Sequence, residues 1–229
     1  MGGGGNPQPG EISLAHNGVL FLDELPEFKR TVLEVMRQPM EDRKVTISRA
    51  KVALDFPASF MLIASMNHCP CGFFNHPDKE CTCGPGVVQK YLGKISGPLL
   101  DRIDLHVEVT PVPFGEISSA KEFEKSEAIR SRVIKAREIQ SERYAQHEGV
   151  YANSQMTSKM LKEICEISTA GQTLLKTAME RLNLSARAYD RILKVSRTIA
   201  DLAGKPNILP EHLAEAIQYR SLDREGWGA

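Results

Sequence analysis

Residues 19–24 read VLFLDE, and this stretch decides the fold prediction. Four consecutive apolar residues are typical of a strand that is buried on both faces, as in a parallel sheet covered by helices. Asp23 and Glu24 follow at the C-terminal end, the edge where such sheets bind ligands. An Asp there can hold Mg²⁺, and a neighbouring Glu can polarise an attacking water. The alternative is a strand that ends in two solvated acids before a turn.

The composition is that of a soluble globular protein of 229 residues, with 41% hydrophobic and 25% charged residues. No apolar run approaches the roughly 18–20 residues that span a bilayer. Residues 1–15 lack the basic start and apolar core of a secretory signal, so we expect a cytoplasmic protein without membrane partners. Lys+Arg and Asp+Glu both number 29, so nucleic-acid binding would require a local basic surface.

Two further strands are predicted in the first half of the chain. They are FMLIAS at 60–65 and DLHVEV at 104–109, both rich in apolar, β-prone residues. Residues 45–54 predict a β-hairpin before the second strand. The fold class predicted for this half is therefore α/β, a partial parallel sheet with helices and one β-hairpin.

The second half is predicted to be helical throughout. Residues 116–146 are heavily charged with helical spacing, and from Thr157 onward every apolar pattern has a helical period. Ser185 is a good N-cap for one of these helices. We predict three parts, an α/β core at 1–112, a charged helical linker at 113–156 and an all-α domain at 157–229.

Three polar residues could join the acidic pair. Asn67 follows the second strand and could orient a water or a phosphate, although a lone Asn is more often a turn former. Arg102 could neutralise a transferring phosphoryl group, or form an ion pair with Asp101 or Asp104. Arg187, near the start of a predicted helix, could bind an anion or only contribute to a solvated basic face.

Four of the five cysteines form two C-x-C-G arms nine residues apart. They are Cys69, Cys71, Cys81 and Cys83. Four thiolates suit tetrahedral Zn²⁺, and the glycines let backbone amides approach sulfur, so a structural zinc is favoured. His68 or His76 could substitute as a ligand, and the alternatives are a metal-free reduced loop or disulfides formed on handling. Cys165 lies in an apolar helical stretch and is predicted to be a core residue.

The predicted hairpin has a basic tip that contains Arg49 and Lys51. Cations on a protruding hairpin suit contacts to DNA phosphates. They also protect an exposed strand edge from association, and the spacing alone favours that protective role.

The motifs together resemble AAA+ ATPases of the branch that contains the magnesium-chelatase ATPase subunit and the MCM helicases, and most closely the bacterial ComM/YifB family. The resemblance covers nearly the whole chain in the family's order. It rests on GEISLAHNGVLFLDELPEF (10–28), RKVTISRAKVALDFPASFMLIASMN (43–67), the two C-x-C-G arms, GPLLDRIDLHVEV (97–109) and LSARAYDRILKVSRTIADLAG (184–204).

The resemblance implies roles for the candidate residues in a site for ATP and Mg²⁺. Asp23, as Mg²⁺ ligand, and Glu24 match the Walker B acids, and Asn67 matches sensor 1. Arg102 matches the arginine finger, and Arg187 matches the phosphate-binding sensor 2 arginine of the helical lid. The 45–54 hairpin matches the pre-sensor-1 hairpin, which in helicase relatives faces the channel of a hexameric ring. The implied partners are copies of the chain itself and DNA.

Family members carry the Walker A phosphate loop upstream of the region that corresponds to position 1. We therefore expect this chain to match their C-terminal portion and to be inactive alone. The Walker A strand would lie between the strands at 60–65 and 104–109, so the α/β part is expected to fold less well than the helical part. The parent is expected to be a hexameric DNA helicase or branch-migration motor. The alternatives are a chelatase-type remodeller of a metal-insertion partner and a non-catalytic lid or assembly fragment.

Overall fold

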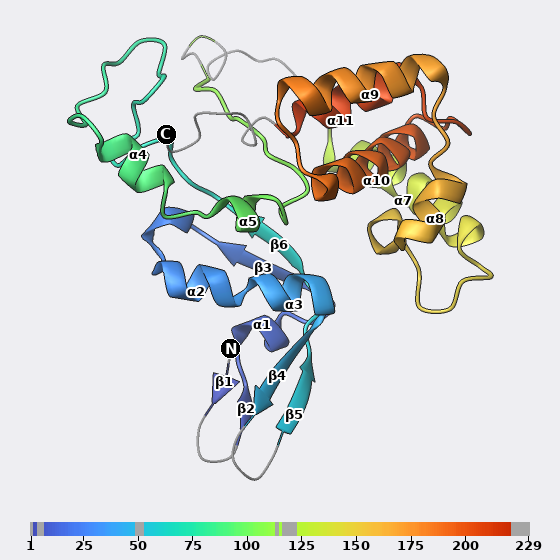
Figure 1. Cartoon of the computed structure of the whole chain (residues 1–229), viewed down its shortest axis with the longest axis horizontal. Helices are drawn as coiled ribbons and strands as arrows, with labels where there is room; N and C mark the ends of the chain where they lie inside the picture. Colours follow the sequence, from blue (N-terminus) through green and yellow to red (C-terminus); the bar gives the residue numbers. More distant parts are fainter. Residues whose placement is uncertain (1, 4–6, 49–52, 113–114, 116–122, 221–229) are drawn as a thin grey trace. The chain divides into compact units, whose positions relative to one another are not determined.

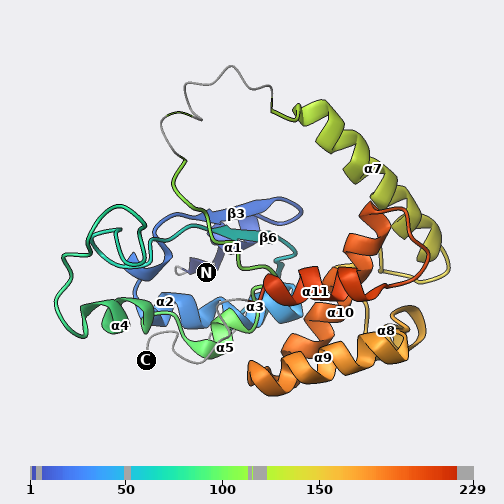
Figure 2. The ribbon, with the colours of Figure 1, turned by 90° about the horizontal axis from the view of Figure 1, so that it is seen from above.

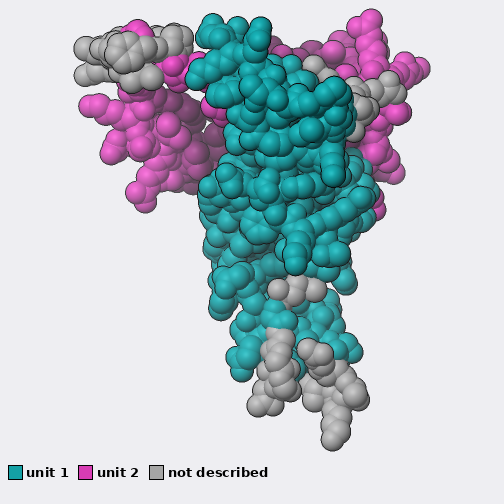
Figure 3. All heavy atoms as spheres, turned by 90° about the vertical axis from the view of Figure 1, so that its left-hand side faces the viewer, with its two compact units in different colours: residues 1–103, 225–229 teal, residues 104–224 magenta. Residues whose placement is uncertain are grey.

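A computed structural model gives the fold of the chain (Figure 1). It describes residues 2–3, 7–48, 53–112, 115 and 123–220. The chain divides into two compact units, residues 1–103 and residues 104–224, which Figure 3 colours separately. The division falls after Ile103, and the predicted boundaries at 112 and 156 stay predictions.

A parallel pair of short strands forms the centre of the first unit. Strand β3 (Val19–Leu22) pairs with β6 (Met61–Ala64), so that Val19 lies opposite Met61 and Leu22 opposite Ala64. This pair and the helices around it confirm the predicted α/β class. The other elements of the unit are β1 (Gly2–Gly3), β2 (Gln8–Pro9), α1 (Glu11–Leu14), the 3-10 turn η1 (Leu25–Glu27), α2 (Arg30–Val35), α3 (Arg37–Asp42), β4 (Lys44–Ser48), β5 (Ala53–Pro57), α4 (Val87–Leu92) and α5 (Gly97–Leu100).

The predicted third strand at 104–109 is wrong, because these residues form no strand in the structure. Strands need a backbone partner, and the resemblance places a further strand between 104–109 and 60–65. Among the described residues no strand takes that place, since β3 and β6 pair only with each other. Residues 104–109 therefore have no ladder to join.

One face of the β3–β6 pair is exposed, which corrects the prediction of a strand buried on both faces. Figure 2 shows helix α2 on one side of the pair. Leu33 of this helix is buried. The exposed face consists of large apolar side chains that alternate along the two strands. They are Val19, Phe21, Met61 and Ile63.

The predicted hairpin is confirmed by the antiparallel pairing of β4 with β5. Val45 and Ile47 of β4 are buried, while the alternate residues Lys44, Thr46 and Ser48 are exposed. This alternation fixes the register, because a slip of one residue would expose the buried pair. The predicted basic tip residues Arg49 and Lys51 lie outside the described residues.

The named elements of the second unit are all helical, and those from residue 157 onward confirm the predicted all-α part. Its elements are α7 (Ser126–Arg143), the 3-10 turn η2 (Asn153–Gln155), α8 (Ser158–Ile164), α9 (Thr169–Arg181), α10 (Ala186–Leu202) and α11 (Pro210–Gln218). Thr157, Ser168 and Ser185 cap α8, α9 and α10 by accepting a backbone hydrogen bond. Cys165 lies in the apolar core, which confirms its predicted role. No helix among the described residues is both long and apolar enough to cross a bilayer.

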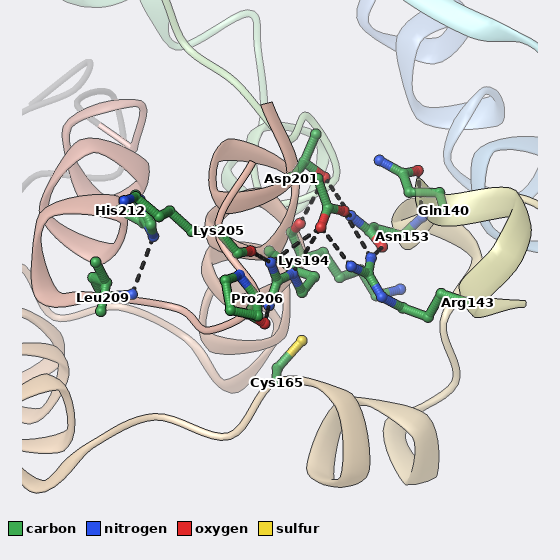
Figure 4. A network of polar contacts seen from close by, with 12 residues as sticks. Gln140, Arg143, Asn153, Cys165, Lys194, Asp201, Lys205, Pro206, Leu209 and His212 are labelled. Carbon is green, nitrogen blue, oxygen red and sulfur yellow. Dashed lines mark hydrogen bonds and ion pairs between the residues drawn. The ribbon is translucent and has the colours of Figure 1, made fainter. Parts of the chain in front are cut away.

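A buried ionic network fastens α7 to α10 (Figure 4). The Asp201 side chain is fully buried and accepts two hydrogen bonds from Arg143, of 2.7 and 2.5 Å. Arg197 Nε donates to Asp201 at 3.1 Å, and Asn153 Nδ2 donates at 2.8 Å. Because every oxygen of this carboxylate is paired, the charge can be buried without a large desolvation penalty.

The protonation of Asp201 follows from this balance. Burial alone would raise the pKa of the carboxyl group, but the hydrogen bonds from Arg143 and Asn153 and the charge of Arg197 hold the pKa below its usual 3.8. A lowered folded-state pKa stabilises the fold above the unfolded value and loses that effect as the pH falls through the folded value. Asp201 therefore stabilises the helical unit fully only above about pH 3.8.

We expect Asp201→Asn to lower the free energy of unfolding of the helical unit by about 3–5 kcal/mol, because Arg197 would keep a buried charge without its partner. Urea denaturation followed by far-UV circular dichroism measures this. The variant should also lose less stability than the wild type below pH 4. Glu180→Gln is the control, since its exposed pair with Lys176 contributes under about 1 kcal/mol. Equal losses in the two variants would contradict the role of the network.

Candidate functional site

The β3–β6 register brings Asp23 beside Ser65. The ladder continues past the strands, because Ser65 N donates to Leu22 O and Leu25 N donates to Ser65 O, both at 2.9 Å. The Ser65 hydroxyl also donates a short hydrogen bond to Asp23 Oδ1. This fixes one oxygen of the carboxylate, and both oxygens belong to an exposed residue that a cation can reach. An exposed, oriented carboxylate fits the hard oxygen donor that Mg²⁺ requires.

Sequence reasoning missed Ser65. The two strands were predicted, and parallel pairing sets their C-terminal residues side by side. To identify Ser65 as the neighbour of Asp23 also requires the pairing register, which the sequence alone does not give.

Glu24 has a left-handed backbone with φ 51° and ψ 53°. Its N–H donates to Asp23 Oδ1 at 3.0 Å, and Pro26 begins the next turn. A residue with a Cβ atom in this region costs about 1–2 kcal/mol. Such strain is concentrated at functional sites, where it directs a side chain. Glu24 therefore follows the fixed Asp23 carboxylate directly, in a left-handed backbone conformation.

Asn67 follows β6 at the same edge and is exposed. The pKa of Tyr91 in α4 is affected by several groups at this edge of the sheet. Burial raises the pKa of the Tyr91 hydroxyl, the carboxylates of Glu27 and Glu24 raise it further, and the backbone amide of Asn67 lowers it. The acidic edge and the Asn67 segment therefore both lie around one tyrosine. The sensor role of Asn67 stays a prediction.

Arg102 lies just after α5 and is buried. Its Nη2 forms an ion pair with Glu41 of α3 at 2.8 Å, and its Nη1 donates to Pro98 O at 2.6 Å. Asp104, one of the partners considered from the sequence, pairs with Arg191. The structure thus shows Arg102 held inside its own unit, and its role as an arginine finger stays a prediction.

Arg187 is the second residue of α10 and is exposed. Ser185 caps this helix by accepting from Ala188 N at 3.2 Å, as the sequence predicted. Arg187 therefore lies at a capped helix N-terminus in the second unit. Its contact with a phosphate stays a prediction.

The four predicted cysteines come together with their sulfur atoms within 4.8 Å of one another. Three Sγ–Sγ distances are 3.3 Å (Cys69–Cys71), 3.7 Å (Cys69–Cys81) and 3.6 Å (Cys71–Cys81). A tetrahedron with Zn–S bonds of about 2.3 Å has sulfur atoms about 3.8 Å apart. The donor set and its spacing therefore fit a tetrahedral thiolate metal site. Neither His68 nor His76 belongs to this ligand group among the described residues.

The backbone around the cysteines faces the sulfur atoms. Gly72 has φ 82°, a left-handed conformation that suits glycine, and Phe74 N then donates to Cys69 Sγ at 3.3 Å. The backbone N–H of Phe73 is the main group that lowers the pKa of Cys71 to about 5. A backbone N–H lowers the pKa of Cys83, but burial and the neighbouring sulfurs raise it to about 12. Four sulfur atoms so close together thus resist full ionisation unless a cation balances them.

Comparison with known proteins matches the chain in two consecutive parts. The family model described as "Magnesium chelatase, subunit ChlI" matches residues 1–117, and "Magnesium chelatase, subunit ChlI C-terminal" matches residues 123–220. The chain belongs to the magnesium chelatase ChlI family. The predicted resemblance to the ComM/YifB group is confirmed by its relatives.

The chain is 46% identical over 225 residues to competence protein ComM of Haemophilus influenzae and 41% identical over 225 residues to YifB of Escherichia coli. Each alignment covers 98% of this chain and 43% of the relative. Magnesium-chelatase subunit ChlI of Nicotiana tabacum is 22% identical over 211 residues, which cover 92% of this chain and 43% of that protein. The chain thus spans less than half the length of these members of the magnesium chelatase family.

We expect Glu24→Gly to be more stable than Glu24→Ala by about 1 kcal/mol, because only glycine adopts the left-handed backbone without strain. Denaturant unfolding of the two variants measures the difference. The matched control is Glu27, which lacks a positive φ. There Ala should be the more stable replacement, since glycine has more conformational freedom to lose. The same order at both positions would contradict the strain at Glu24.

Proposed function

We propose that this chain is the part of an ATP-hydrolysing AAA+ protein that carries the acidic edge, the sensors and the lid. The observation that supports this best is the β3–β6 register, which holds Asp23 beside Ser65 and directs Glu24 from a strained turn at one sheet edge. Family membership supports the nucleotide context.

In this proposal Asp23 binds Mg²⁺ and Glu24 polarises the attacking water. Asn67 orients that water or the terminal phosphate, and Arg187 contacts a phosphate from the lid. Arg102 acts on the nucleotide of a neighbouring subunit in a homo-oligomeric ring, which we propose to be a hexamer. That role requires Arg102 to exchange Glu41 for a phosphate.

Phosphate binding needs a further element. The 229 residues contain no GxxxxGK[ST] pattern, whose backbone amides and Lys surround the β- and γ-phosphates. The relatives are more than twice as long as the matched region. We therefore propose that residues outside these 229 supply the phosphate loop, and that the chain alone does not turn over ATP.

The proposed task of the whole protein is movement on DNA in the cytoplasm, as a helicase or branch-migration motor. The 46% identity to a competence protein and the basic residues Arg49 and Lys51 support this reading. The alternative is a chelatase-type ATPase that remodels a metal-insertion partner, which the 22% identity to a chelatase subunit supports less strongly. Co-purification with a porphyrin-binding partner would favour that alternative. A non-catalytic lid or assembly fragment is the third possibility.

The cysteine cluster is proposed to hold one structural Zn²⁺. The sulfur spacing fits the ion, and the N–H groups directed at sulfur are typical of such sites. Four protein ligands close the coordination sphere, so the ion would have no open position for chemistry of its own.

We expect Glu24→Gln to lower kcat for ATP hydrolysis by about 10²–10⁴, the usual contribution of a general base, while ATP still binds. The assay uses the natural polypeptide that contains this chain. Glu11→Gln, an exposed acid on α1, is the control and should leave kcat unchanged. Full turnover by Glu24→Gln would contradict the assignment, and turnover by the 229-residue chain alone would contradict the need for an external phosphate loop.

A second variant of the same polypeptide tests the proposed DNA binding separately from ATP hydrolysis. Arg49→Ala with Lys51→Ala should weaken binding to single-stranded or forked DNA and reduce its salt dependence, by a slope of roughly one for each lost phosphate contact. Lys29→Ala with Arg30→Ala removes equal charge from the start of α2 and should leave DNA binding unchanged. Equal effects would count against the hairpin tip as a DNA contact.

We expect one Zn²⁺ per chain after purification without chelator, measured by atomic emission. Cys71→Ser and Cys81→Ser should lower the content strongly, and Cys165→Ser, which lies in the helical core, should not. Less than about a tenth of an equivalent in the unmodified chain would contradict a structural site, which requires one ion per four ligands.

A further inference from the structure

The cysteine cluster and the acidic edge are joined by one short segment. Asn67 lies between Met66 and Cys69, and both of these pack in the apolar cluster that includes all four cysteines. Cys69 is completely buried, whereas Asn67 is exposed at the sheet edge. The position of Asn67 therefore depends on Met66 and Cys69, its sequence neighbours that pack in the cysteine cluster.

Tyr91 makes a second link. Its ring is buried in the same cluster as Cys69. Besides burial, the carboxylates of Glu27 and Glu24 raise the pKa of its hydroxyl group, and the backbone amide of Asn67 lowers it. One side chain thus packs in the cysteine cluster and lies near enough to the acidic edge for the charges of Glu24 and Glu27 to raise its pKa.

Lys94, just after α4, makes a third link. Its Nζ lies 3.7 Å from Glu27 Oε1 and 5.6 Å from the centre of the Tyr91 ring. Glu27 belongs to η1, the turn that directly follows Glu24. Helix α4, which starts four residues after Cys83, is therefore tied to the turn that carries the acidic pair.

We propose that metal binding by the four cysteines positions Asn67, through Cys69 and Tyr91, for the chemistry at the acidic edge. This rests on the proposed ATPase function and on the proposed zinc. Coordination joins the two C-x-C arms and fixes Cys69, so Met66 and Tyr91 keep their packing and the intervening Asn67 keeps its place. Tyr91 is a positioning residue, and the metal takes part in no bond that is made or broken.

The proposal is tested first without any catalytic readout, by amide hydrogen exchange on the zinc-loaded natural polypeptide. Removal of zinc by a chelator should raise exchange at residues 65–69 by at least about tenfold, as expected for local opening. Exchange in α10 should stay unchanged, which shows that the protein remains folded. Unchanged exchange at 65–69 after zinc removal would overturn the proposal, and so would a polypeptide that contains no zinc.

Tyr91→Phe supplies the second test, because it keeps the ring in the cluster and removes only the hydroxyl. We expect zinc content to stay at one equivalent, exchange at 65–69 to rise, and kcat for ATP to fall by about tenfold with little change in KM. Tyr151→Phe, at an exposed tyrosine, is the matched control. Wild-type exchange at 65–69 in Tyr91→Phe would overturn the link through Tyr91.

These readouts separate the two proposals. If the polypeptide hydrolyses no ATP but exchange at 65–69 responds to zinc and to Tyr91→Phe, the ATPase proposal fails and the mechanical link stands. If ATP is hydrolysed and neither exchange nor kcat responds, the link fails and the ATPase proposal stands.

Discussion

The parallel pairing of β3 with β6, only four residues long, determines which residues come together at the candidate site. It sets the ends of two distant segments side by side, so that Ser65 orients Asp23 and the loop to Asn67 leaves from the same edge. A shift of one residue in this register would turn the side chains to the other face and separate these groups. The position of the acidic pair therefore depends on the backbone hydrogen bonds that set this register.

Local patterns predicted the elements whose causes are local. The apolar run at 19–22, the alternation in the hairpin and the Ser185 cap all appear where the sequence placed them. Contacts between distant residues, such as Ser65 with Asp23 and Arg102 with Glu41, were missed because no periodicity encodes a partner. The strand at 104–109 failed for a related reason, since strand propensity is realised only when a neighbour supplies hydrogen bonds.

The two units are stabilised by different means. The helical unit has a closed apolar core and a fully paired buried charge at Asp201. The α/β unit leaves a row of large side chains, Phe21 and Met61 among them, in water on one sheet face. Full burial of one such side chain contributes about 1.5–3 kcal/mol. The sequence-based expectation that the α/β part is the weaker of the two therefore has a physical basis in this face.

Arg102 shows what a catalytic exchange would require. Its side chain is 6% exposed, its charge is balanced by Glu41, and the carbonyl of Pro98 accepts a hydrogen bond from it. Withdrawing either partner without replacement would leave a desolvated cation, which costs several kcal/mol. A triphosphate carries more negative charge than one carboxylate, and guanidinium binds both with the same forked geometry. Glu41 is 40% exposed and can be hydrated when it is released, so the exchange is feasible only when a phosphate arrives as Glu41 leaves. The proposed finger would then respond to an occupied neighbouring site and remain paired beside an empty one.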